Sequence, residues 1–223
     1  VIFNIRDGIY DQTLNFQGTI SGTSSTNTIT FKSESNDRNK VQLSGAIFKS
    51  SGFIIFSDLT YKRTTSSPIG LIDLTGTCSD ITIKNIIFKD SVVSGTNGCI
   101  RYYENIYLGN NFVENIHILD NLFIGGLIPI YINAPGGLVG VKISNNQFRD
   151  YAYVGMQLEN YAINPYAGIL VSGNSFSSTQ NNVRALAISV NGKFLVEKNN
   201  ITGNQSGMEL GYSGDYANRG TVA

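Results

Sequence analysis

Aromatic and planar polar side chains recur at matching positions of three short alternating segments. The segments begin at Cys99, Pro129 and Gly155, and the third and fifth residues of each are polar or aromatic. Tyrosine rings can stack on the C–H faces of a sugar, while guanidinium, amide and carboxylate groups can hydrogen-bond its hydroxyls. An ordinary solvated sheet face with cross-strand pairs is the alternative interpretation. The candidate binding residues, called the patch below, are Arg101, Tyr103, Tyr131, Asn133, Gln157 and Glu159.

Catalytic and metal centres are not indicated by the spacing of the ionisable residues. A polysaccharide lyase needs a base, and it needs Arg, Lys or Ca²⁺ to neutralise a uronate carboxylate; Arg101 could serve the second role. The acidic residues Asp73, Glu159 and Glu209 fall in different repeats, which disfavours a Ca²⁺ cluster. The single histidine, His117, has no second histidine or cysteine beside it and is predicted to be a surface side chain. We therefore assign no catalytic residue, no metal and no cofactor.

The two cysteines are predicted to be free thiols. Cys78 falls in the turn after one strand, whereas Cys99 aligns with Leu71 in the next repeat. The two are then about seven positions apart along the path, or roughly 20 Å of extended chain. A disulfide requires Cα atoms within about 7 Å.

The elements that would position the patch are visible as an internal repeat. Six ungapped segments share the pattern apolar-x-apolar-x-x-Asn-x-aromatic, with Leu59 and Ile86 in place of asparagine in the first two. Their starts are separated by 27, 35, 25, 28 and 25 residues. The segments are Ile54–Tyr61, Ile81–Phe88, Ile116–Phe123, Val141–Phe148, Ile169–Phe176 and Phe194–Ile201.

Each of these segments is preceded by a second alternating run and followed by a third short strand that starts at its aromatic residue. Alternation with a period of two indicates half-buried strands. Three short strands per coil of 25–28 residues predict an all-β fold, a parallel β-helix (β-solenoid), with coils stacked about 4.8 Å apart. A six-stranded sandwich is the alternative, but it predicts short hairpin turns and no fixed position for asparagine.

The asparagine of the repeat falls at a tight corner between the second and third strands. There it can hydrogen-bond the backbone and the asparagine of the next coil, forming a ladder. Asparagine also tolerates the left-handed backbone conformation that such a corner can require. The predicted ladder consists of Asn121, Asn146, Asn174 and Asn199.

The repeats resemble those of the right-handed parallel β-helix superfamily, which includes pectate lyases, chondroitinase B-like lyases and many secreted bacterial repeat proteins. The I-x-I-x-x-N-x-F segments carry this resemblance, and Ile5–Phe16 (IRDGIYDQTLNF) is similar to the entry coil of such proteins. Residues 18–35 are similar to first coils of secreted proteins of the Bacteroidetes type. In that superfamily the strand before each repeat belongs to the sheet that usually faces substrate, so the resemblance implies that the patch faces a ligand. The adjacent aspartates of its polygalacturonases do not occur here.

Composition and charge disfavour nucleic acid as a partner, a helical fold and insertion into a membrane. The 223 residues include 16 basic and 16 acidic residues, and this balance disfavours nucleic acid as a partner. Helix formers are scarce while Ile, Val, Thr, Tyr and Phe are abundant, which excludes a helical bundle. No apolar run is long enough to predict membrane insertion. We expect one domain over 1–223, with entry coils over 1–45, regular coils over 46–212 and an open or truncated end over 213–223.

The leading functional hypothesis is a secreted or cell-surface β-helix with a structural or binding role, adhesin-like or glycan-binding, within a larger exoprotein. Its partners would be a polysaccharide and the flanking domains of a longer chain or a surface assembly. Two other classes stay open. A lyase or hydrolase acting on acidic polysaccharide requires ionisable groups that converge on the substrate, whereas a rigid spike or spacer requires no cleft.

Overall fold

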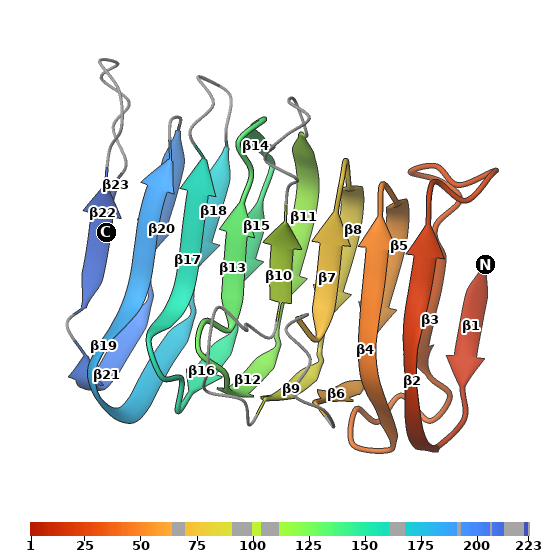
Figure 1. The fold of residues 1–223 in the computed structure, drawn as a ribbon, viewed down its shortest axis with the longest axis horizontal. Helices are drawn as coiled ribbons and strands as arrows, with labels where there is room; N and C mark the ends of the chain where they lie inside the picture. Colours follow the sequence, from red (N-terminus) through yellow and green to blue (C-terminus); the bar gives the residue numbers. More distant parts are fainter. Residues whose placement is uncertain are drawn as a thin grey trace.

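The computed structural model describes residues 1–63, 70–90, 100–103, 112–160, 168–190, 193–205, 207–211 and 221–222. Within these ranges, the side chains of residues 100–103, 160, 181–182, 204–205, 210–211 and 221–222 are not described. The described elements are all β-strands, and they wind into a parallel β-helix (Figure 1). The prediction of an all-β solenoid is therefore confirmed.

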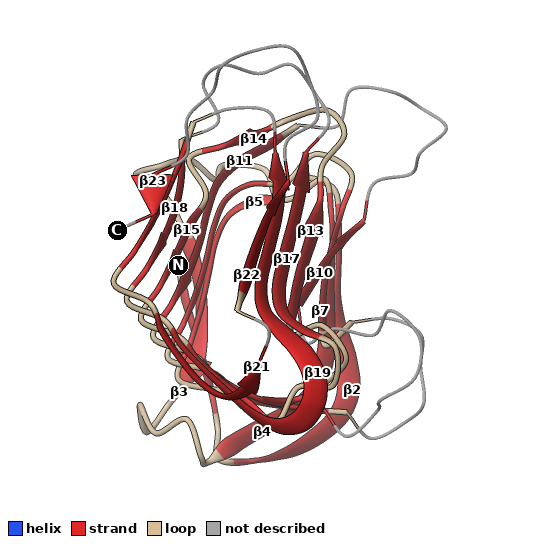
Figure 2. Cartoon of the chain, turned by 90° about the vertical axis from the view of Figure 1, so that its left-hand side faces the viewer, coloured by secondary structure: helices blue, strands red, loops and turns tan. Residues whose placement is uncertain are grey.

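The coils have three faces, seen nearly end-on in Figure 2. Face 1 is one sheet of parallel strands, and faces 2 and 3 together make the second sheet. Face 1 contains β1 (Ile2–Ile5), β3 (Ile29–Ser33), β5 (Gly52–Ser57), β8 (Ser79–Lys84), β11 (Val113–Leu119), β14 (Leu138–Val139), β15 (Lys142–Ser144), β18 (Ile169–Ser172), β20 (Phe194–Glu197) and β23 (Thr221–Val222).

Faces 2 and 3 are separate strands in some coils and a single bent strand in others. Face 2 contains β6 (Thr60–Lys62), β9 (Ile87–Asp90), β12 (Leu122–Gly125), β16 (Gln147–Arg149) and β21 (Asn200–Gln205). Face 3 contains β7 (Ile72–Thr75), β10 (Ile100–Tyr103), β13 (Ile130–Asn133), β17 (Val154–Asn160) and β22 (Met208–Gly211). The strands that bend across both faces are β2 (Gly8–Gln17), β4 (Val41–Lys49) and β19 (Ser175–Val190). The expected three strands per coil thus become two in these coils.

The repeat alignment agrees with the pairing of the strands. Ile54, Ile81 and Ile116 are register partners on face 1, and Ile169 pairs with Phe194. Because each of these side chains points inward, the repeat columns form a continuous buried core. The segment Ile5–Phe16, which is similar to an entry coil, contributes most of β2, and Ile2, Phe3 and Ile9 are exposed at this end.

The asparagine ladder is present at the corner between faces 1 and 2. Asn121, Asn146 and Asn174 are buried, and Asn199 is half-buried. The backbone N–H of Asn121 donates to Asn146 Oδ1, that of Asn146 to Asn174 Oδ1 and that of Asn174 to Asn199 Oδ1, each at 2.9 Å. Each side chain therefore satisfies backbone groups that a tight corner cannot pair within a sheet.

The left-handed residue of each corner is the one before the ladder asparagine, and not the asparagine itself. The residues with positive φ are those directly before the ladder asparagines, for example Asp120 (57°), Asn145 (58°) and Lys198 (56°). The ladder asparagines have no positive φ. Their side chains are needed for hydrogen bonds across coils, so the strained backbone falls to the preceding residue.

Aromatic rings of face 2 form a second column inside the coils. Phe88, Phe123, Phe148 and Phe176 are stacked with centroid separations of 4.7, 4.8 and 4.6 Å, close to the strand spacing. Tyr61 continues this column, with its ring centroid 5.7 Å from that of Phe88. The hydroxyl of Tyr61 is buried without a hydrogen-bond partner among the described residues, and this burial raises its pKa.

Tyr61→Phe is expected to raise the free energy of unfolding by about 1 kcal/mol, because it removes a buried hydroxyl that has lost its water without gaining a partner. Urea denaturation followed by circular dichroism measures the change. Tyr153→Phe, which removes an exposed hydroxyl, is the matched control and should be neutral. Destabilisation by Tyr61→Phe would contradict the interpretation.

The positions of Cys78 and His117 agree with those predicted from the sequence. Cys78 is a free, buried cysteine whose thiol pKa is raised by burial, whereas Cys99 lies outside the described residues. His117 lies on face 1 between its register partners Thr82 and Lys142. Partial burial, followed by the charge of Lys142, lowers its pKa.

Candidate functional site

The patch lies on face 3, where adjacent parallel strands carry its residues in register. Arg101 of β10 pairs with Asp73 of β7 and with Tyr131 of β13, and Tyr131 pairs with Gln157 of β17. Parallel strands at this spacing hold successive positions about 4.8 Å apart. Arg101 and Tyr103 belong to a described strand, but their side chains are outside the described set.

The other four patch residues form one hydrogen-bonded network. Tyr131 Oη donates to Glu159 Oε2 at 3.1 Å, and Gln157 Nε2 donates to Glu159 Oε1 at 2.5 Å. Asn133 Nδ2 in turn donates to Tyr131 Oη at 3.2 Å. Because both carboxylate oxygens of Glu159 accept hydrogen bonds, its orientation is fixed by residues of two strands.

A groove adjoins this network on the C-terminal side and is called the face 3 groove. It has a volume of about 240 Å³ and crosses β17, β19 and β22. Its lining includes aromatic, amide, carboxylate, guanidinium and hydroxyl groups. The lining residues are Tyr153, Gln157, Leu158, Glu159, Arg184, Ala187, Ile188, Ser189 and Glu209.

The sequence pattern did not indicate that Tyr153, Arg184 and Glu209 belong to one site. Tyr153, at the start of the groove, is 47% exposed. Arg184 Nη1 lies 2.6 Å from Glu209 Oε2, and this ion pair is open to solvent. Arg184 lies in β19 ahead of the alternating run that was aligned with the other repeats, so the pattern gave no signal for it.

The register of β19 differs from the sequence alignment by two residues. Alignment of the alternating run Ala187–Val190 with Gly155–Leu158 predicts that Ser189 lies beside Gln157. Instead Gln157 pairs with Ala187, and Ser189 pairs with Glu159. Glu209 pairs with Ala187 and so remains in the column of Gln157. A slip of two residues keeps every side chain on its own face, so hydrophobic alternation cannot detect it.

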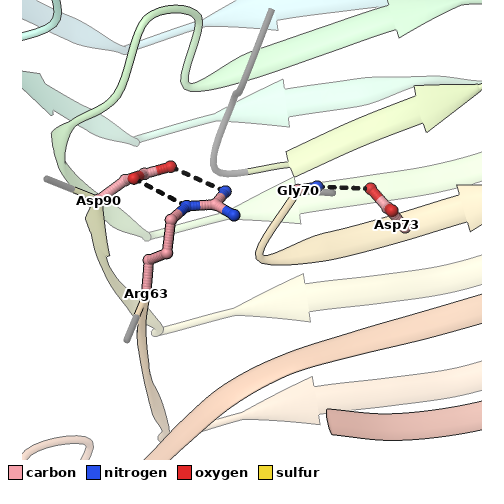
Figure 3. A network of polar contacts seen from close by, with 4 residues as sticks. All are labelled: Arg63, Gly70, Asp73 and Asp90. Atoms are coloured by element: carbon pink, nitrogen blue, oxygen red, sulfur yellow. Dashed lines mark hydrogen bonds and ion pairs between the residues drawn. The ribbon is translucent and has the colours of Figure 1, made fainter. Parts of the chain in front are cut away.

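Asp73 occupies the same position of its alternating run as Arg101 and Tyr131, which predicts an outward side chain, but the structure shows that it is buried. Its exposed fraction is 8%, and Asp73 Oδ1 accepts a hydrogen bond from the backbone N–H of Gly70 at 3.0 Å (Figure 3). Asp73 therefore does not contribute to the accessible part of this column of outward residues.

The described ranges contain no group of three or more His, Cys, Asp or Glu residues arranged to hold a metal ion. They also contain no helix with the length and apolarity needed to cross a membrane.

Part of the chain matches a known protein family. A family described as a protein of unknown function (DUF1565), whose members are right-handed β-helix proteins, matches residues 130–221. This region runs from β13 to β23 and includes every lining residue of the face 3 groove. The sequence has no match among the curated proteins or the solved structures. The stacked parallel coils, together with the family match, place this chain in the right-handed parallel β-helix superfamily.

Proposed function

We propose that the chain is a binding segment of an extracellular protein and that the face 3 groove holds a linear polysaccharide. The observation that carries the proposal is the groove, in which an exposed tyrosine and planar polar groups share one open surface. Sugars offer both apolar C–H faces and hydroxyls, so such a mixture of groups suits them.

The spacing of the strands supports a ligand that runs along the solenoid axis. The groove crosses three neighbouring strands, and two strand spacings amount to about 10 Å, roughly two sugar residues. Tyr153 supplies a stacking surface, and Glu159 is held as a hydrogen-bond acceptor. The Arg184–Glu209 pair supplies both donors and acceptors.

The hydrogen bonds of the groove favour binding over catalysis. A general base must reach the proton that it removes, but both oxygens of Glu159 already accept hydrogen bonds. A lyase also needs a cation that neutralises the substrate carboxylate, and the charge of Arg184 is matched by Glu209. The groove therefore resembles a surface that orients a glycan more than one that activates it.

Tyr153→Ala is expected to weaken glycan binding about tenfold, equivalent to ~1.4 kcal/mol, through loss of the stacking surface. A glycan array identifies a ligand for the wild type, and calorimetry compares the variants. Tyr10→Ala, which removes another exposed tyrosine at the opposite end of the chain, is the matched control. Affinity should rise with the length of the oligosaccharide as more contacts become available.

Three results would overturn the proposal. Absence of wild-type binding to every acidic and neutral polysaccharide on the array would favour a rigid spacer. Release of products with the ultraviolet absorbance of unsaturated uronates would identify a lyase instead. Equal weakening by Tyr10→Ala would remove the groove as the binding surface.

A further inference from the structure

Face 2 carries a pair of lysines at neighbouring positions of adjacent strands. Lys62 of β6 and Lys89 of β9 are register partners, and both side chains are exposed. Within the described part of the chain, neither ammonium group forms an ion pair. Like charges directly opposite each other in a sheet repel, so this pair is unfavourable unless an anion accompanies it.

The residues that follow these two lysines form a buried ion pair. Arg63 Nε and Nη2 donate to Asp90 Oδ1 and Oδ2 at 2.9 and 3.0 Å (Figure 3). The side chains of Arg63 and Asp90 are 4% and 0% exposed. Asp90 therefore offsets the charge of Arg63, and the two lysines leave this group of four residues with a formal net charge of +2.

A hollow lies between these residues and the next coil, and we call it the basic hollow. It is lined by Lys62, Arg63, Lys89, Asp90 and Ile124. The register partner of Asp90 in the next strand is Gly125, which has a positive φ of 76° and brings no side chain to this position. A Cβ atom at Gly125 would lie 2.0 Å from the carbonyl oxygen of Asp90, so no larger residue fits.

We propose that the basic hollow is a second binding site, which takes an anionic substituent, a carboxylate or a sulfate ester, of an acidic polysaccharide. Two lysines whose backbones lie one strand spacing apart, about 4.8 Å, can share one such group or contact the charges of successive sugars. The apolar side chain of Ile124 lines the hollow and offers a surface for the carbon skeleton of the sugar. This site lies on a different face from the groove and stands independently of the proposed function.

The test compares two double variants that remove the same charge. Lys62→Gln/Lys89→Gln alters the basic hollow, whereas Lys84→Gln/Lys142→Gln removes two exposed lysines from face 1. Binding of oligogalacturonate, which carries carboxylates, and of a heparin-derived oligosaccharide, which carries sulfates, is measured by calorimetry at low salt. The Lys62/Lys89 variant should bind at least about tenfold more weakly, while the Lys84/Lys142 variant should match the wild type.

The two probes also identify the anion. Loss of binding for only one oligosaccharide in the Lys62/Lys89 variant assigns the site to a carboxylate or to a sulfate ester. Equal losses in both double variants would show a general charge effect and overturn the proposal, as would failure of the wild type to bind either probe. The Lys62/Lys89 variant leaves every lining residue of the groove intact, so a loss of binding confined to this variant tests the basic hollow separately from the groove.

Discussion

Replacing Asn146 by leucine is expected to lower the free energy of unfolding by about 3 kcal/mol. Asn146 Oδ1 accepts from the backbone N–H of Asn121, and Asn146 Nδ2 donates to the carbonyl oxygens of Ile118 and Ser144 at 2.9 and 3.1 Å. Leucine fills a similar volume but provides neither donor nor acceptor. Each buried backbone group that loses its partner costs roughly 1–3 kcal/mol, and urea denaturation measures the sum.

Asn199→Leu is the matched control at the half-buried end of the same ladder. Asn199 makes equivalent bonds to Asn174 and to the carbonyl oxygen of Val171, but water can replace part of what is lost there. We expect a smaller loss of stability, about 1 kcal/mol. An equal loss in both variants would show that burial does not set the cost. If Asn146→Leu leaves the free energy of unfolding unchanged, this corner tolerates leucine, as does the corresponding corner of the first repeat, where Leu59 replaces asparagine.

The coil architecture was predictable because the repeat places asparagine and aromatic residues at fixed positions. Stacked coils explain why these residue types recur at the same positions. A fixed asparagine followed two positions later by an aromatic residue indicates a corner and a buried column, and both are found at Asn121 with Phe123 and at Asn146 with Phe148. The left-handed corner residue varies among Asp, Asn, Gly and Lys, so it left no consistent pattern.

The candidate site was less predictable because its members depend on where strands bend. β19 rounds the corner between faces 2 and 3 as one strand, whereas β16 and β17 are separate strands. Sequence periodicity does not distinguish one bent strand from two separate strands. The bend in β19 places Arg184 beside Glu209 and pairs Ser189 with Glu159. The link from Tyr131 through Glu159 to Gln157 followed from correct alignment of β13 with β17.

Replacing Arg63 by methionine is expected to lower the free energy of unfolding by about 4 kcal/mol. The variant keeps the apolar length of the side chain but removes the bidentate partner of the Asp90 carboxylate, which is fully buried. A charge that is removed from water and then loses its counter-charge is costly, whereas two apolar residues in its place can be neutral. Arg63→Met/Asp90→Leu should therefore recover most of the lost stability.

Urea denaturation of the wild type, both single variants and the double variant gives the coupling energy between Arg63 and Asp90. Arg184→Met is the control, because it breaks an ion pair whose side chains are 43% and 58% exposed and should cost no more than about 1 kcal/mol. If Arg63→Met lowers the free energy of unfolding no more than Arg184→Met does, the Arg63–Asp90 pair is solvated in solution. The basic hollow would then be wider than its lining indicates. A large loss that the double variant recovers would show that the fold tolerates an apolar replacement of the pair. Arg63 and Asp90 would then not be required for folding, and a role for their charges in shaping the anion site beside Lys62 and Lys89 would be favoured.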